Sequence, residues 1–174
     1  GFGKDWLLSP LENAAKEGNK DEIEELLNNI KADDNESCPL FFVPYPLKFA
    51  VKYGHSTIAE MIVEKSVSFV KDHPSSAPKM RDMLIAGLKA AISTRSLEIV
   101  ELLIKANVDP NFHSKYYGSL HTLLEEDRGE FFTVECLEWL LAAGADVNLG
   151  VECKPPKSNS PFYLACKNAH YPQV

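Results

Sequence analysis

Four segments of the chain carry apolar residues at helical spacing. In each, a central apolar residue has a second apolar residue three positions before it and a third directly after it. The central positions are Leu26, Ile62, Leu103 and Leu140. An i, i+3, i+4 spacing places these side chains on one face of an α-helix. The pattern therefore predicts four amphipathic helices, each with one buried face.

A shorter helical pattern precedes each of these segments, and a fifth copy lies near the end of the chain. One of its columns is Leu11, Leu47, Leu88, Leu120 and Phe162, and the other is Ala14, Ala50, Ala91, Leu123 and Ala165. Small residues let neighbouring helices approach closely, so we expect both columns to be buried. Ser9 and Pro10, with Glu12 three residues after the serine, form a capping-box pattern and predict that Ser9 caps a helix whose first residue is Pro10.

The same short phrase opens every one of these units. Ser-Pro-Leu-Glu-Asn-Ala-Ala at 9–15 returns as Tyr-Pro-Leu-Lys-Phe-Ala-Val at 45–51, and shorter versions stand at 87–91, 118–122 and 160–165. Two units close alike, with Val-Asp-Pro-Asn at 108–111 and Ala-Asp-Val-Asn at 145–148. Self-similarity in a fixed order indicates a stack of like supersecondary units.

In these features the chain resembles the ankyrin-repeat family, whose unit of about 33 residues is a tight turn followed by two helices. The central column advances here by 36, 41 and 37 residues, so each unit carries an insertion. The resemblance implies an all-α solenoid of helix-turn-helix units with irregular turns between repeats. We expect an N-terminal capping segment at 1–8 and a repeat domain at 9–174. Its repeats fall at about 9–40, 45–78, 79–111 and 118–148, with a partial repeat at 160–174.

Composition narrows the classes of function. The chain has 174 residues, 45% of them apolar and 25% charged, which is typical of a soluble globular protein and fits one domain. A net charge of −7 argues against a nucleic-acid partner. No apolar run approaches the roughly 18 residues of a membrane span, so we expect no membrane insertion of this segment. We expect the isolated domain to be a monomer.

The residues with reactive side chains do not form a catalytic pattern. The sequence has no phosphate-binding loop, nucleophile elbow or zinc-protease motif, so we expect no enzyme activity, cofactor or metal. The four cysteines, at 38, 136, 153 and 166, lack C-x-x-C spacing and predict free buried thiols in a cytoplasmic or nuclear protein. The acidic run 125–127 is interpreted as solvated surface. His55 and His121 occupy family columns, where the resemblance implies a hydrogen bond to neighbouring backbone.

The resemblance implies a protein partner bound on a concave face, which the first helices and the turns before them would line. Aromatic residues are enriched at interface hot spots, and two such turns are rich in them. The candidate contact residues are Phe41, Phe42, Tyr45, Lys52, Tyr53, Lys115, Tyr116 and Tyr117. For Phe41 and Phe42 a second possibility is that the turn folds back and buries both rings in the core.

Together these features predict a non-catalytic protein-interaction module of a larger protein, which we expect to continue past Val174. One alternative is the cytosolic ankyrin domain of a membrane channel. Another is a targeting domain attached to an enzyme, such as an effector or a ubiquitin-ligase adaptor. The negative net charge favours a partner segment with some Lys or Arg.

Overall fold

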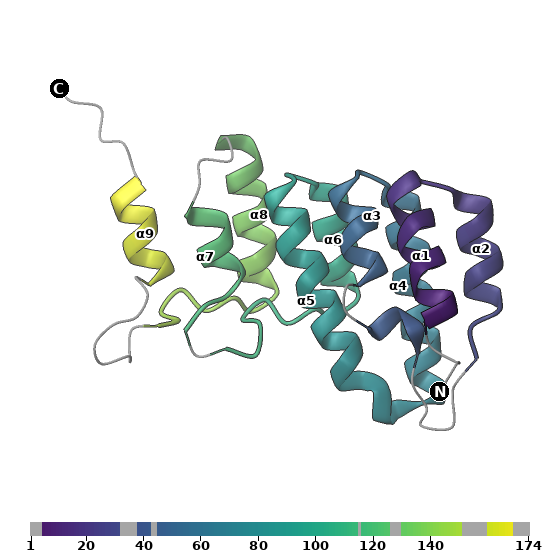
Figure 1. The fold of residues 1–174 in the computed structure, drawn as a ribbon. Helices are drawn as coiled ribbons and strands as arrows, with labels where there is room; N and C mark the ends of the chain where they lie inside the picture. The colour runs from purple at the N-terminus through teal and green to yellow at the C-terminus, as the bar shows by residue number, and fades with distance from the viewer. Residues whose placement is uncertain are drawn as a thin grey trace. The chain divides into compact units, whose positions relative to one another are not determined.

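Helices are the only regular elements in the part of the chain that the structure, a computed structural model, describes (Figure 1). It describes residues 5–31, 38–42, 45–114, 116–125, 130–150 and 160–168, with backbone alone for 5–9, 130 and 168. The α-helices are α1 (Asp5–Glu17), α2 (Lys20–Asn28), α3 (Pro46–Lys52), α4 (Ser56–Asp72), α5 (Ala77–Ser93), α6 (Leu97–Lys105), α7 (Ser119–Leu124), α8 (Glu130–Ala142) and α9 (Pro161–Asn168). Two 3₁₀ turns are η1 (Pro39–Phe41) and η2 (Pro74–Ser76). The predicted all-α class is confirmed.

The chain consists of two compact units, Gly1–Val108 and Asp109–Val174. In the first unit, α1, α3 and α5 pack side by side as a first row, and α2, α4 and α6 pack as a second row (Figure 1). Each first-row helix also packs against the helix that follows it in the chain. The first unit is therefore two layers built from three helix pairs. In the second unit, α7 packs against both α8 and α9.

The turn inside each pair of the first unit has one backbone geometry. An amide donates a hydrogen bond to the carbonyl of an alanine five positions earlier, and the residue just before the donor has a positive φ. The bonds are Asn19 N to Ala14 O (3.1 Å), His55 N to Ala50 O (2.8 Å) and Ser96 N to Ala91 O (2.9 Å). The positive-φ residues are Gly18 (75°), Gly54 (80°) and Arg95 (57°). This is the Schellman helix end, so the three pairs share their turn as well as their hydrophobic pattern.

The two predicted first-helix columns are buried in α1, α3, α5 and α7. In these four helices each column residue is at most 2% exposed. In the column of the second helices, Ile62, Leu103 and Leu140 are fully buried. A Cβ atom at Gly87 would lie 2.8 Å from Leu47 Cδ2, so the glycine lets α5 approach α3 closely. The expected close packing at small residues is thus present, and Gly87 adds to it.

In helices α2 and α9 some residues depart from the predicted burial pattern. Leu26 is only half-buried, while Ile23, Leu27 and Ile30 point into the core. Two of the three predicted stripe residues of α2, Ile23 and Leu27, are thus buried as predicted, and Leu26 is less covered because α2 ends the second row and packs mainly against α1 and α4. In α9, Phe162 and Ala165 are exposed, and Pro161 and Leu164 are buried instead. Among the described helices α9 packs mainly against α7, so only one side of it is covered.

The start of the first helix also differs from the prediction. Helix α1 begins at Asp5, and both Ser9 and Pro10 lie inside it. Proline removes one hydrogen bond near the start of a helix, and an acidic residue in the first turn is favoured by the helix dipole. The helix therefore extends upstream of the predicted cap. Helix α4 is longer than α2 and α6 and continues to Asp72, two residues before Pro74.

Candidate functional site

The candidate contact residues are divided between the two units. Phe41, Phe42, Tyr45, Lys52 and Tyr53 belong to the first unit, and Tyr116 and Tyr117 belong to the second. Lys115 lies outside the described residues. The prediction of one surface that combines both turns therefore stays a prediction.

Phe41 belongs to the core. It closes the 3₁₀ turn η1, is 5% exposed, and meets the Phe69 ring of α4 edge-on at 6.0 Å between centroids. Such T-shaped contacts are a favoured packing of aromatic rings. Of the two possibilities for this residue, the structure shows the one in which the turn folds back and buries the ring. Phe41 therefore contributes stability rather than an accessible contact.

Phe42 and Tyr45 are intermediate cases. The ring of Phe42 is half-buried, with Lys79 Nζ 6.0 Å from its centroid. Tyr45 is half-buried at the residue before α3, and burial, with a smaller effect from the negative charge of Asp82, raises the pKa of its phenol. Both side chains can offer an edge to a partner without a change in the core.

Lys52 and Tyr53 form the accessible part of the predicted site. They end α3, both are exposed, and Lys52 Nζ lies 5.8 Å from the Tyr53 ring centroid. The end of α1 lies next to them, since Lys16 Nζ stands 4.3 Å above the ring of Phe49 in α3. The sequence analysis missed Phe49. The sequence feature that could have identified Phe49 is its aromatic side chain at a position that holds Asn13 and Ala90 in the neighbouring first-row helices.

In the second unit the two tyrosines behave differently. Tyr116 is 51% exposed. Tyr117 is half-buried, its ring stacks on His121 at 5.0 Å, and its hydroxyl donates to Glu125 Oε2 at 2.7 Å. Tyr117 is therefore held by its own unit, and Tyr116 is the more accessible of the pair.

His55 and His121 each make the predicted hydrogen bond to neighbouring backbone. His55 Nε2 donates to the Lys16 carbonyl oxygen at 3.0 Å, and so ties the second pair to the turn of the first. The Gly118 amide donates to Nδ1 of the buried His121 at 3.1 Å, which fixes the start of α7. Both imidazole rings therefore have a structural role, because each one holds a backbone segment in place.

The two closing motifs share one turn as well. Asp109 accepts a hydrogen bond from the Asn111 amide at 2.9 Å, and Asp146 accepts one from the Asn148 amide at 2.8 Å. The Asn111 side chain also links the two turns. Its Nδ2 donates to the Gly144 carbonyl at 3.0 Å, and its Oδ1 accepts from the Asp146 amide at 2.9 Å. Successive turns of the second unit are thus held together by one asparagine.

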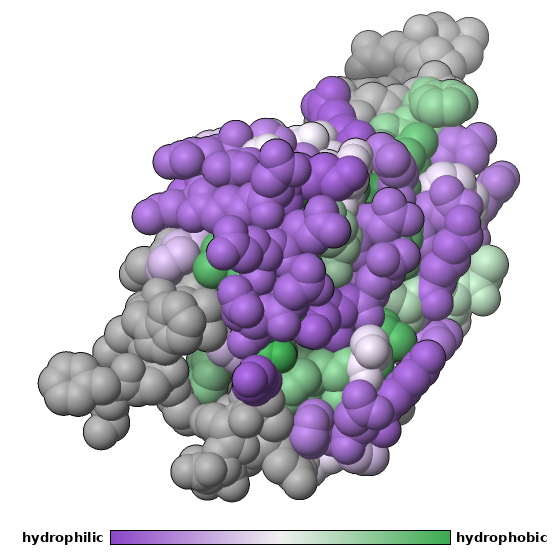
Figure 2. Space-filling view, turned by 90° about the vertical axis from the view of Figure 1, so that its right-hand side faces the viewer, coloured by the Kyte–Doolittle hydropathy of each residue, from purple (hydrophilic) through white to green (hydrophobic). Residues whose placement is uncertain are grey.

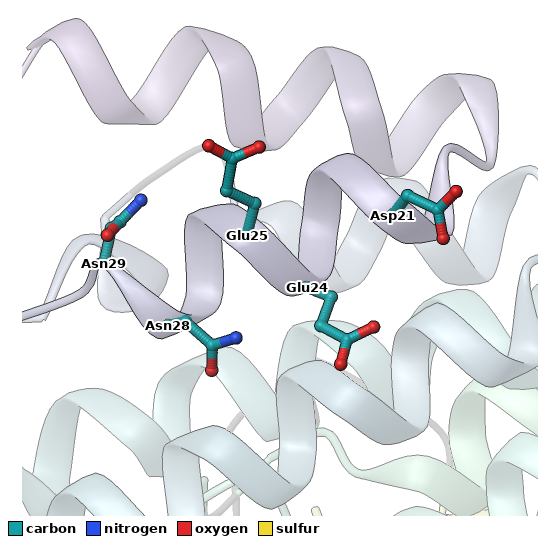
Figure 3. Close-up of a pocket in the computed structure, with 5 residues that line it drawn as sticks. All are labelled: Asp21, Glu24, Glu25, Asn28 and Asn29. Carbon is teal, nitrogen blue, oxygen red and sulfur yellow. The ribbon is translucent and has the colours of Figure 1, made fainter.

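The acidic side chains of α2 do not converge on a site. Asp21, Glu24 and Glu25 line a shallow depression with Asn28 and Asn29, and Figure 3 shows Glu24 and Glu25 pointing to opposite sides of the helix. Figure 2, which looks onto the α2 end, shows a face dominated by hydrophilic side chains. Within the described ranges, no group of three or more His, Cys, Asp or Glu is arranged to hold a metal ion. Of the acidic run 125–127, only Glu125 is described, and it is exposed.

The cysteines correct one prediction. Cys38 and Cys136 are free and buried as expected, but Cys166 is exposed because it lies on the uncovered side of α9. Cys153 lies outside the described residues. Burial raises the pKa of the Cys38 thiol to about 11. A buried thiol with that pKa stays protonated at physiological pH and is unreactive.

No helix in the described ranges has the length and apolar character needed to cross a membrane. No family model matches the chain, and no curated protein matches it.

Proposed function

We propose that the chain is an ankyrin-type repeat domain that binds a partner protein through its first-row helices and the adjoining turns. The observation that carries this proposal is the repeated turn of the first unit. Three successive pairs share a buried leucine, a buried alanine and a left-handed residue, and the alanine carbonyl accepts the same hydrogen bond in each. The linked Asp-x-Asn turns of the second unit repeat in the same way. A chain of stacked units offers an extended surface for recognition.

The exposed side chains of the first row favour recognition over catalysis. Lys52 and Tyr53 stand at the open end of α3, and Lys16 and Phe49 extend the same surface toward α1. Tyr116 offers a second accessible ring in the second unit. Tyrosine is one of the residue types enriched at interface hot spots. We place the module in the cytoplasm or nucleus, where buried free thiols such as Cys38 and Cys136 remain reduced.

Affinity capture from a lysate with single variants tests this proposal. Tyr53→Ala and Tyr116→Ala each remove a ring that is 51% exposed, and Phe131→Ala removes a 74% exposed ring from α8 as the matched control. All three should keep the wild-type circular dichroism spectrum, since none of these rings is in the core. We expect at least one tyrosine variant to lose a captured protein that Phe131→Ala retains. Retention by both tyrosine variants with loss by Phe131→Ala would place binding on the second helices and refute the proposal.

A further inference from the structure

The two helix rows of the first unit carry opposite charge. The first row, α1, α3 and α5, holds six cationic residues and four carboxylates, and α3 and α5 alone hold five cationic residues and one carboxylate, Asp82. The second row, α2, α4 and α6, holds nine carboxylates and four lysines. The net charge of −7 therefore conceals a basic layer.

Four lysines of the first row, with two aromatic residues of α3 and its C-terminal end, form what we call the lysine patch. It consists of Lys16, Lys48, Lys52, Lys89, Phe49 and Tyr53. The register of the helices brings these positions together. Lys16 Nζ lies 4.3 Å above the Phe49 ring, which joins α1 to α3. Lys48 and Lys89 each follow a column leucine, Leu47 or Leu88, and so hold matching positions on the packed helices α3 and α5.

The cations on α3 are available to a partner. Lys48 and Lys52 stand one helical turn apart and both are exposed. Within the described part of the chain neither is ion-paired with a carboxylate. The carboxylates of the same row are Asp5, Glu12 and Glu17 of α1 and Asp82 of α5, and α3 has none, so the positive charge is densest on α3.

We propose that the lysine patch docks an acidic segment of a partner protein, with side-chain carboxylates on Lys48 and Lys52 and an apolar side chain against Tyr53. This inference rests on the proposed function and names the chemistry of the partner. It reverses the expectation of a basic partner, which followed from the net charge of the whole chain. A local surface is recognised through its own potential, and complementary charge both steers and orients a partner.

The distribution of charge favours an acidic protein segment over a nucleic acid. A nucleic-acid strand presents a long, uniform line of phosphates and needs an extended cationic track. Here the patch is short, Glu12 and Glu17 border it, and an acidic second row lies behind it. A short segment with a few carboxylates and one apolar anchor fits these limits.

Fluorescence anisotropy with defined probes tests the proposal on the whole chain. The probes are a short fluorescein-labelled peptide rich in Asp and Glu with one Leu and one Phe, its counterpart with Asn and Gln in place of the acids, and an oligothymidylate of similar length. Vesicles of phosphatidylcholine and phosphatidylserine form a fourth arm. Lys48→Gln/Lys52→Gln is the test variant. Lys71→Gln/Lys105→Gln, which makes the same charge change at exposed positions of the second row, is the control.

We expect the wild-type chain to prefer the acidic peptide to its amide counterpart and to bind it more weakly as salt rises. The test variant should lose about tenfold in affinity, and the control variant less than about twofold. Equal binding of the two peptides, equal loss in both variants, or a preference for oligothymidylate or vesicles would overturn the inference. A partner captured from lysate that depends on Tyr53 but binds Lys48→Gln/Lys52→Gln at full strength would leave the interaction module standing and refute only its acidic chemistry.

Discussion

Gly18 offers a direct measurement of how one helix pair supports its neighbour. Its φ is +75°, and a Cβ atom there would lie 2.5 Å from Cε1 of the His55 ring. That ring belongs to the next pair and donates a hydrogen bond to the Lys16 carbonyl. Gly54 is the matched position, because its φ is +80° and a Cβ atom there would meet nothing within 4 Å. The two glycines therefore share a backbone constraint and differ in one contact.

The expected loss in the free energy of unfolding follows from the backbone constraint and from the contact with the His55 ring. An alanine in the left-handed region costs about 1–2 kcal/mol, so we expect Gly54→Ala to destabilise by that amount. At Gly18 the same strain applies, and the His55 ring must also move. Loss of its hydrogen bond to Lys16 adds about 0.5–1.5 kcal/mol. We therefore expect Gly18→Ala to cost roughly 1.5–3.5 kcal/mol.

Urea unfolding followed by helical circular dichroism measures both costs. A double-mutant cycle with His55→Ala then isolates the contact, because removing the ring removes the obstruction at residue 18. In the His55→Ala background, Gly18→Ala should cost no more than Gly54→Ala. Equal costs for the two glycine variants in the wild-type background, or a Gly18→Ala cost that does not depend on His55, would refute the assignment of this contact.

Three further predictions concern the core, the linked turns and pH. Leu103→Ala and Leu140→Ala should each cost about 2–5 kcal/mol in urea unfolding. Lys52→Ala should cost under about 0.5 kcal/mol, and equal losses for all three would show that the column register is wrong. Asn111→Ala removes two hydrogen bonds to the turn after α8 and should cost about 1–3 kcal/mol. Amide exchange in that turn should accelerate, and unchanged exchange would contradict the link. Burial raises the pKa of Cys38 from 9.0 to about 11, so the unfolded chain releases this proton at lower pH than the native chain. Stability should therefore fall by up to about 2–3 kcal/mol between about pH 9 and pH 11, and a Cys38→Ala variant that shows the same fall would exclude the thiol as its source.

The sequence was most informative where the same local interactions recur. The two first-helix columns are buried in α1, α3, α5 and α7, because each of these helices packs against neighbouring helices of its own compact unit. Helical periodicity alone could therefore identify Leu47 and Leu88 as core residues. The prediction failed for Leu26 of α2 and for both column positions of α9, where a helix has fewer neighbours and the buried side is set by which neighbour it has. Phe162 follows the helical phrase but points away from α7 for this reason.

The contact surface was harder to predict because exposure depends on residues far apart in the sequence. Phe41 and Phe42 are adjacent, yet the first is in the core because Phe69 of α4 lies beside it. The grouping of Lys16 with Phe49 depends on the register between α1 and α3, which a list of residues does not contain. Net charge was equally uninformative about a single face, since it adds both helix rows together.

The opposed charges of the two rows have a consequence for handling the protein. They give the first unit an electric dipole directed from one layer to the other. On a positively charged resin or sensor surface the acidic second row is attracted and the basic first row is repelled. The first unit should therefore adsorb in one preferred orientation, with α3 and Tyr53 turned toward the solution. Immobilisation on an anionic surface should bury the same residues and hide binding that the other orientation would reveal.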